Sequence, residues 1–188
     1  MKLPVYQGMA RAQAARRAAR AQSAGQVARR ERPDGHGAAG AARLRDPIRM
    51  EYRTGNELDL DQVIELYRAS TLGERRPVDD RERMGKMLAA ANLVITAWEG
   101  GTLMGIARSV TDGAYCTYLS DLAVRLSHQR QGIGRELMRR TQAAAPEATL
   151  ILLAAPKAAE YYPHVGFSRH ESCWILRPGE TIASEAEQ

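Results

Sequence analysis

The sequence predicts an α/β (α+β) domain over residues 47–182, in which helices flank a sheet. Three observations support this prediction. Segments with alternating apolar residues are interleaved with segments whose apolar residues recur every three or four positions, as in strands and amphipathic helices. Glycine-containing turns separate several of the predicted strands. A polar stretch with two glycines, HQRQGIGRELMRR at 128–140, joins a long predicted strand to a helix.

The first part of the domain is predicted to hold one strand and two helices. The alternating stretch IRMEYR at 48–53 predicts a strand. A helix is predicted over 58–70, because Asp59 precedes apolar residues at helical spacing and a glutamine follows it at the capping-box position. The same logic places the N-cap of a second helix at Asp79, after the polar loop GERRPV.

The second part alternates strands with helices. Strands are predicted at 93–98 and 103–110 (joined by a Gly-Gly hairpin), at 114–124, at 149–154 and at 173–176. The wholly apolar run at 149–154 is typical of a strand in the buried middle of a sheet. Helices are predicted from residue 133, with Ile133, Leu137 and Met138 facing inward, and at 157–162.

Composition limits the function classes. No apolar run approaches the roughly 20 residues that a membrane span requires, and no secretory signal is visible, so a cytoplasmic protein is expected. Two cysteines, Cys116 and Cys173, lie in apolar patterns and are expected to be buried reduced thiols. The four histidines lack ligand spacing with the cysteines, so no metal site is expected.

The positive charge belongs to an N-terminal extension. Residues 1–46 carry ten Lys/Arg against three Asp/Glu, a net charge of +7, whereas residues 47–188 carry seventeen against nineteen, a net charge of −2. The extension is rich in alanine and arginine, and three interpretations stay open: a disordered tail or a gene start that is really near Met50, a polyanion-binding arm, or a transit peptide. Nucleic-acid binding is therefore not expected except through this arm. Residues 183–188 are expected to form a C-terminal tail.

The two glycines of the 128–140 stretch predict an anion site. A helix N-terminus presents unpaired N–H groups and a partial positive charge, and glycine lets a phosphate approach the backbone. Arg130 and Arg135 flank this position and can add charged contacts. An ordinary strand-to-helix turn is the alternative. Neither a dinucleotide fingerprint nor a P-loop is present, because the third glycine and the Gly-Lys-Ser/Thr sequence are missing.

At this point the chain resembles a known family. LAVRLSHQRQGIGRELM is similar to the acetyl-CoA-binding segment of the GNAT superfamily of N-acetyltransferases, whose Gln/Arg-x-x-Gly-x-Gly/Ala pattern falls on Gln129, Gly132 and Gly134. AAEYYPHVGF resembles the family's Tyr-x-x-x-Gly-Phe segment, beginning at Tyr162. The resemblance extends over about residues 47–178, with both motifs in the family's order and spacing.

The resemblance implies a mixed, mostly antiparallel sheet that splays after the fourth strand. Acetyl-CoA, the implied co-substrate, would lie in the split and place its pyrophosphate on the glycine loop. The implied cofactor-binding residues are Leu122, Ala123, Val124, Gln129, Arg130, Gln131, Gly132, Ile133, Gly134 and Arg135. The sequence departs from the family at Ala155, where an asparagine often contacts the cofactor.

Acetyl transfer needs a neutral amine, a donor for the thioester oxygen and an acid for the departing thiolate. The resemblance assigns the acid to Tyr162. A backbone N–H near Leu122 or Val124 would donate a hydrogen bond to the thioester oxygen and stabilise its negative charge. For the base, a regular strand turns Tyr118 and Ser120 toward the site, whereas a β-bulge would expose Asp121 instead. Both remain candidates, and each has a structural alternative: packing for Tyr118 and pairing with an arginine for Asp121.

The acceptor is left open by the sequence. Ser120, Tyr118 and Glu74 are candidate substrate contacts, and Glu74 would suit a cationic amine, whereas Arg75 and Arg76 would suit an acceptor with a carboxylate or phosphate. The leading hypothesis is an N-acetyltransferase acting on the primary amine of a small molecule. A protein N-terminal or lysine acetyltransferase and a non-catalytic acyl-CoA-binding protein are the alternatives, and the oligomeric state, monomer or homodimer, stays open.

Overall fold

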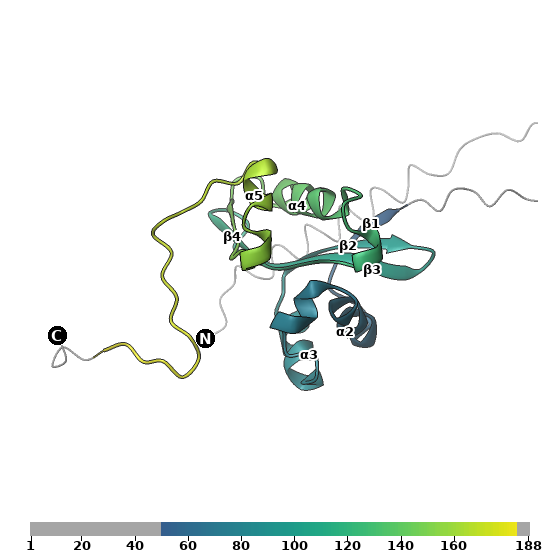
Figure 1. Ribbon diagram of the computed structural model, residues 1–188, viewed down its shortest axis with the longest axis horizontal. Helices are drawn as coiled ribbons and strands as arrows, with labels where there is room; N and C mark the ends of the chain where they lie inside the picture. The colour runs from purple at the N-terminus through teal and green to yellow at the C-terminus, as the bar shows by residue number, and fades with distance from the viewer. Residues whose placement is uncertain (1–49, 184–188) are drawn as a thin grey trace, which may run out of the picture. The chain divides into compact units, whose positions relative to one another are not determined.

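A five-stranded sheet runs through the computed structural model, which describes residues 50–183 (Figure 1). Its strands lie in sequence order: β1 (Glu51–Thr54), β2 (Leu93–Glu99), β3 (Thr102–Thr111), β4 (Cys116–Val124) and β5 (Thr149–Ile151). The first four pair antiparallel, and β4 pairs parallel with β5, so the predicted mixed, mostly antiparallel sheet is confirmed. The predicted extension at 1–46, and all but one residue of the predicted tail, lie outside the described residues.

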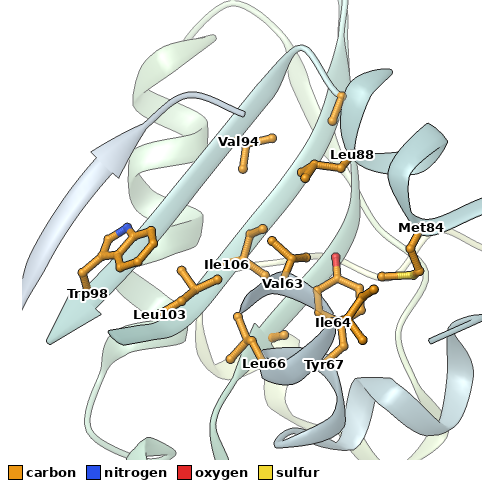
Figure 2. Packing of buried hydrophobic residues seen from close by; sticks show 12 residues of the cluster. Val63, Ile64, Leu66, Tyr67, Met84, Leu88, Val94, Trp98, Leu103 and Ile106 are labelled. Carbon is orange, nitrogen blue, oxygen red and sulfur yellow. The ribbon is translucent and has the colours of Figure 1, made fainter. Parts of the chain in front are cut away.

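Helices α2 (Leu60–Arg68) and α3 (Arg81–Ala89) cover one face of the sheet, and a 3-10 turn, η1 (Thr71–Arg75), joins them. Figure 2 shows the apolar side chains of α2 directed at those of β2 and β3 in a cluster that also includes Met84 of α3. As predicted, Asp59 caps α2, because its carboxylate accepts from the backbone N–H of Asp61 at 2.9 Å.

The N-cap of α3 is Asp80, and the prediction of Asp79 was wrong by one residue. The helix begins one residue later than predicted because a turn precedes it, in which the Asp80 N–H donates to the Pro77 carbonyl. The Asp80 carboxylate then accepts from the Arg83 N–H at 2.9 Å. The Asp79 side chain is 93% exposed and instead pairs with Arg68 at 2.8 Å.

Helix α4 (Ile133–Ala144) packs on the opposite face (Figure 1). Ile133, Leu137 and Met138 are buried, as their spacing predicts. The helix lies directly over Gly105 of β3, where an added Cβ would come within 3.0 Å of Leu137 Cδ1 and 3.2 Å of Ile133 Cγ2. The missing side chain therefore sets how closely α4 can approach the sheet.

The apolar run at 149–154 forms a short edge strand, and its predicted place in the middle of the sheet was wrong. Only 149–151 pair with β4, and no described residue pairs with the other edge of β5. Ile151 is 47% and Leu153 45% exposed. The run is apolar for another reason, since Leu152 and Leu153 line a cleft described below. The helix predicted at 157–162 is divided into η3 (Pro156–Ala158) and α5 (Tyr161–His164).

The strand predicted at 173–176 is absent, since residues 168–183 contain neither helix nor strand. Four consecutive residues with strand propensity do not form a strand unless the edge of another strand offers backbone hydrogen bonds. Trp174 is left 93% exposed. Cys173 is exposed as well, contrary to prediction, and Cys116 is half-buried; both thiols are free.

Candidate active site

The sheet opens between β4 and β5. Pairing stops at Tyr118 and Ile151, so the rest of β4, residues 119–124, has no described strand partner on its β5 side. The opening leads to a cleft, here called the β4–β5 cleft, which lies between η1, β4, the segment after β5 and α5. It is lined by Thr71, Leu72, Arg75, Arg76, Leu119, Ser120, Leu122, Leu152, Leu153, Ala155, Ala158 and Tyr162.

A β-bulge interrupts β4 at Ser120. Asp121 pairs with Arg108 of β3 and Leu119 pairs with Ser109, so Ser120 is the extra residue on its strand. Leu119 consequently joins the cluster under α4, whereas Asp121 reaches Tyr67 in the cluster under α2. Of the two strand geometries that the sequence leaves open, the structure has the bulged one.

The bulge buries Asp121 in an ionic cluster rather than exposing it. Its side chain has no exposed surface, and its oxygens accept from Arg76 Nε at 2.5 Å, from Arg108 Nε, and from the Tyr67 hydroxyl at 2.8 Å. Burial raises the pKa of Tyr67, and the charge of Asp121 raises it further. Burial by itself would lower the pKa of Arg108, but the hydrogen bond to Asp121 raises it above its usual value.

The same two arginines fasten the bulge to its surroundings. Arg76 Nη2 donates to the Ser120 carbonyl at 2.7 Å, and Arg108 Nη2 donates to the Ser120 hydroxyl at 2.8 Å. Arg108 Nη1 donates to the Met87 carbonyl of α3 at 3.0 Å. The cluster therefore joins β4, the end of η1 and α3. Sequence analysis gave pairing with an arginine as the alternative role of Asp121, and this alternative is confirmed. It did not identify which arginines pair with Asp121, nor the hydrogen bond from Tyr67.

Tyr162 lines the β4–β5 cleft at the start of α5. Its ring is half-buried and meets Phe167 edge-on, with ring centroids 5.6 Å apart. Burial raises the pKa of its phenol, the nearby Tyr161 raises it further, and the charge of Arg75 opposes the shift. The phenol therefore keeps its proton at neutral pH and can act as a donor inside the cleft.

The glycine loop before α4 has a backbone shaped for anions. Arg130 and Gly132 both have positive φ, 62° and 83°. No side chain caps α4, so the N–H groups of its first turn stay available to a ligand. A Cβ at Gly134 would lie 3.7 Å from Val124 Cγ2, so this glycine faces the end of β4. The loop fits the phosphate site that the sequence predicts.

Side chains on the inner side of this loop hold it against the domain. Gln129, predicted to bind the cofactor, donates through Nε2 to the Val124 carbonyl at 3.1 Å. His128 Nε2 lies 3.1 Å from a Glu99 carboxylate oxygen, and Arg125 pairs with Glu65 of α2. Arg130, Gln131 and Arg135 are exposed, while Ala123 and Ile133 are buried and present only backbone.

Three of the predicted site residues do not line the β4–β5 cleft. Tyr118 is 37% exposed, Glu74 is exposed and Asp121 is buried, and none of the three is a lining residue. Ser120, Leu122 and Tyr162 do line it. Among residues 50–183, no group of three or more His, Cys, Asp or Glu side chains could hold a metal ion, and no helix is long and apolar enough to cross a membrane.

Comparison with known proteins agrees with this geometry. Residues 70–174 match the model of the acetyltransferase (GNAT) domain, whereas no curated protein matches the chain. A GNAT-family acetyltransferase from Streptococcus pneumoniae is 27% identical, with 69% of this chain and 99% of that chain covered and a TM-score of 0.57.

Two aminoglycoside acetyltransferases share the fold. One, solved in complex with CoA, is 17% identical over 71% of this chain and 97% of that chain, with a TM-score of 0.56. The other, from an uncultured soil metagenomic sample and solved with sisomicin, is 22% identical over 71% and 97%, with a TM-score of 0.54. The predicted GNAT fold is thus confirmed, and the chain belongs to the GNAT family of acetyltransferases.

Proposed function

We propose that the protein transfers the acetyl group of acetyl-CoA to the primary amine of a small molecule. The observation that carries this proposal is the opening of the sheet after Tyr118 and Ile151, which leaves a free β4 edge leading into the uncapped N-terminus of α4. An extended pantetheine arm can bond such an edge as an added strand would. The amides of residues 130–135, together with Arg130 and Arg135, would hold the pyrophosphate.

Acetyl-CoA would supply the activated acetyl group as a thioester. Tyr162 would donate its phenolic proton to the sulfur as the bond from carbonyl carbon to sulfur breaks, and the phenolate would then regain a proton from solvent water. The raised pKa of the phenol keeps this proton in place at neutral pH until the step. A backbone N–H of Leu122 or Val124 would stabilise negative charge on the carbonyl oxygen. Neither Tyr118 nor Asp121 lines the β4–β5 cleft. We therefore propose that the amine enters in its neutral form and that the proton it loses on becoming an amide passes to solvent water.

The test is release of the CoA thiol from acetyl-CoA across a panel of polyamines, aralkylamines, amino acids and peptides, with calorimetry of acetyl-CoA binding alongside. Turnover with small amines supports the proposal. Turnover confined to peptides would favour a protein acetyltransferase. Binding of acetyl-CoA without turnover of any amine would favour a non-catalytic acyl-CoA-binding protein and contradict the proposal.

A further inference from the structure

The charged side chains that line the β4–β5 cleft are all positive. Its two charged lining residues are both arginines, Arg75 and Arg76, and no aspartate or glutamate lines it. The carboxylates of the neighbouring loop are engaged elsewhere: Asp79 pairs with Arg68, and Asp80 caps α3. Glu74 is exposed and is not a lining residue.

The two arginines differ in what they already bind. Arg76 donates to the Asp121 carboxylate, to the Ser120 carbonyl and to the Arg75 carbonyl, so its guanidinium is neutralised and occupied. The Arg75 guanidinium forms no ion pair or hydrogen bond with any described residue, although the backbone that carries it is held by Arg76. One free guanidinium therefore remains at the wall of the cleft.

Arg75 is also close to the proposed acid. Both residues line the same cleft, and the charge of Arg75 acts on the phenol of Tyr162. An acceptor amine that reacts beside Tyr162 therefore lies within the field of this free charge. A cationic site favours the neutral, reactive form of an amine, but it repels acceptors that carry further positive charges.

The free guanidinium predicts that this chain and the aminoglycoside acetyltransferases that share its fold differ in acceptor. Aminoglycosides carry several ammonium groups, and a guanidinium in the cleft would repel them. A guanidinium does suit a carboxylate or a phosphate, because its planar donors bind two oxygens at once.

We propose that the acetyl acceptor carries an anionic group, a carboxylate or a phosphate, near its amine, and that Arg75 binds this group and sets acceptor specificity. The proposal rests on the proposed function and concerns the same cleft. Of the two kinds of acceptor that the sequence leaves open, it favours the amine with a carboxylate or phosphate, which Arg75 and Arg76 suggest, over the cationic amine that Glu74 suggests.

The test uses pairs of amines that differ in the anionic group alone: L-phenylalanine with phenethylamine, L-leucine with isoamylamine, and O-phosphoethanolamine with ethanolamine. Spermidine is the polycationic probe. Values of kcat/KM are measured by CoA thiol release for the full chain and for Arg75→Gln, Arg75→Lys and Arg75→Glu. Arg83→Gln is the matched control, because Arg83 is an exposed arginine of α3 outside the cleft.

We expect the anionic member of at least one pair to be preferred tenfold or more, chiefly through KM. Arg75→Gln should remove this preference, Arg75→Lys should retain part of it, and Arg75→Glu should shift the preference toward spermidine. Comparing the first two pairs with the third shows whether the preferred acceptor carries a carboxylate or a phosphate. Arg83→Gln should change nothing.

Equal or better turnover of the amines that lack the anionic group, or a preference that survives Arg75→Gln, would overturn the inference and leave the proposed function intact. Acetyl-CoA binding without turnover of any amine would instead remove the proposed function, and the inference with it. Calorimetry of acetyl-CoA binding to Arg75→Gln should show unchanged affinity. A tenfold loss there would assign Arg75 to the cofactor rather than to the acceptor and would also overturn the inference.

Discussion

Replacing Asp121 with asparagine is expected to destabilise the domain severely. The carboxylate has no exposed surface, and the Arg108 side chain that it neutralises is 8% exposed, so the substitution leaves a buried guanidinium without its counter-charge. Breaking a buried ion pair from one side costs about 3–5 kcal/mol. The Arg76 side chain, 21% exposed, can turn toward water and adds less. For a domain of this size, about 3–6 °C is lost per kcal/mol, so the melting temperature should fall by roughly 10–25 °C.

Urea denaturation of the full chain measures this loss directly. Asp61→Asn is the matched control, because Asp61 and its partner Arg81 are 70% and 62% exposed, and an exposed pair contributes about 1 kcal/mol at most. The double variant Asp121→Asn with Arg108→Gln should lose less than the sum of the two single variants, because it removes both charges. A loss below about 1 kcal/mol for Asp121→Asn would refute the reasoning. Full stability combined with lost turnover would restore Asp121 as a candidate base.

Three further predictions concern the cofactor, the acid and the extension. Gly134→Val should weaken acetyl-CoA binding at least tenfold by calorimetry, about 1.4 kcal/mol, while the fold persists, because its Cβ has ordinary contact distance to Val124; Gly134→Ala is the milder control, and unchanged affinity in the valine variant would remove this site. Tyr162→Phe should lower kcat by roughly 10²–10⁴-fold with little change in acetyl-CoA affinity. Because burial raises the pKa of the Tyr162 phenol, the wild-type enzyme should lose rate only at a pH higher than an ordinary phenol would give, and this loss should be absent in the variant. An unchanged kcat would make Tyr162 a packing residue. Deleting residues 1–46 should leave the melting temperature and cofactor affinity unchanged, since their composition offers no apolar face for packing; a large drop in melting temperature would show the opposite.

The elements that sequence analysis predicted well are those with local signals. The cap at Asp59, the inward face of α4 and the Gly-Gly hairpin each depend on residues a few positions apart. The shape of the glycine loop is local in the same way, because its positive φ angles and the uncapped end of α4 lie within one turn of backbone, whereas anion binding there stays a prediction.

The elements that sequence analysis missed depend on partners that are far away along the chain. Whether 149–154 becomes a central or an edge strand depends on what pairs with its far side, and the four apolar residues at 173–176 have the propensity for a strand but no described neighbour. The role of Asp121 depends on Tyr67, Arg76 and Arg108, which lie 13 to 54 residues away along the chain. No local pattern could decide between a base and an ion-pair partner.

The bulge at Ser120 has a consequence for insertions and deletions. Since Ser120 is the extra residue of β4, removing it would keep Leu119 and Asp121 on the faces they now occupy. The core would tolerate the shorter strand, but Arg76 and Arg108 would each lose a hydrogen-bond acceptor. A chain without Ser120 should therefore fold and lose the geometry of its cleft. The extra residue is therefore expected to matter for the shape of the cleft and not for the packing of the core.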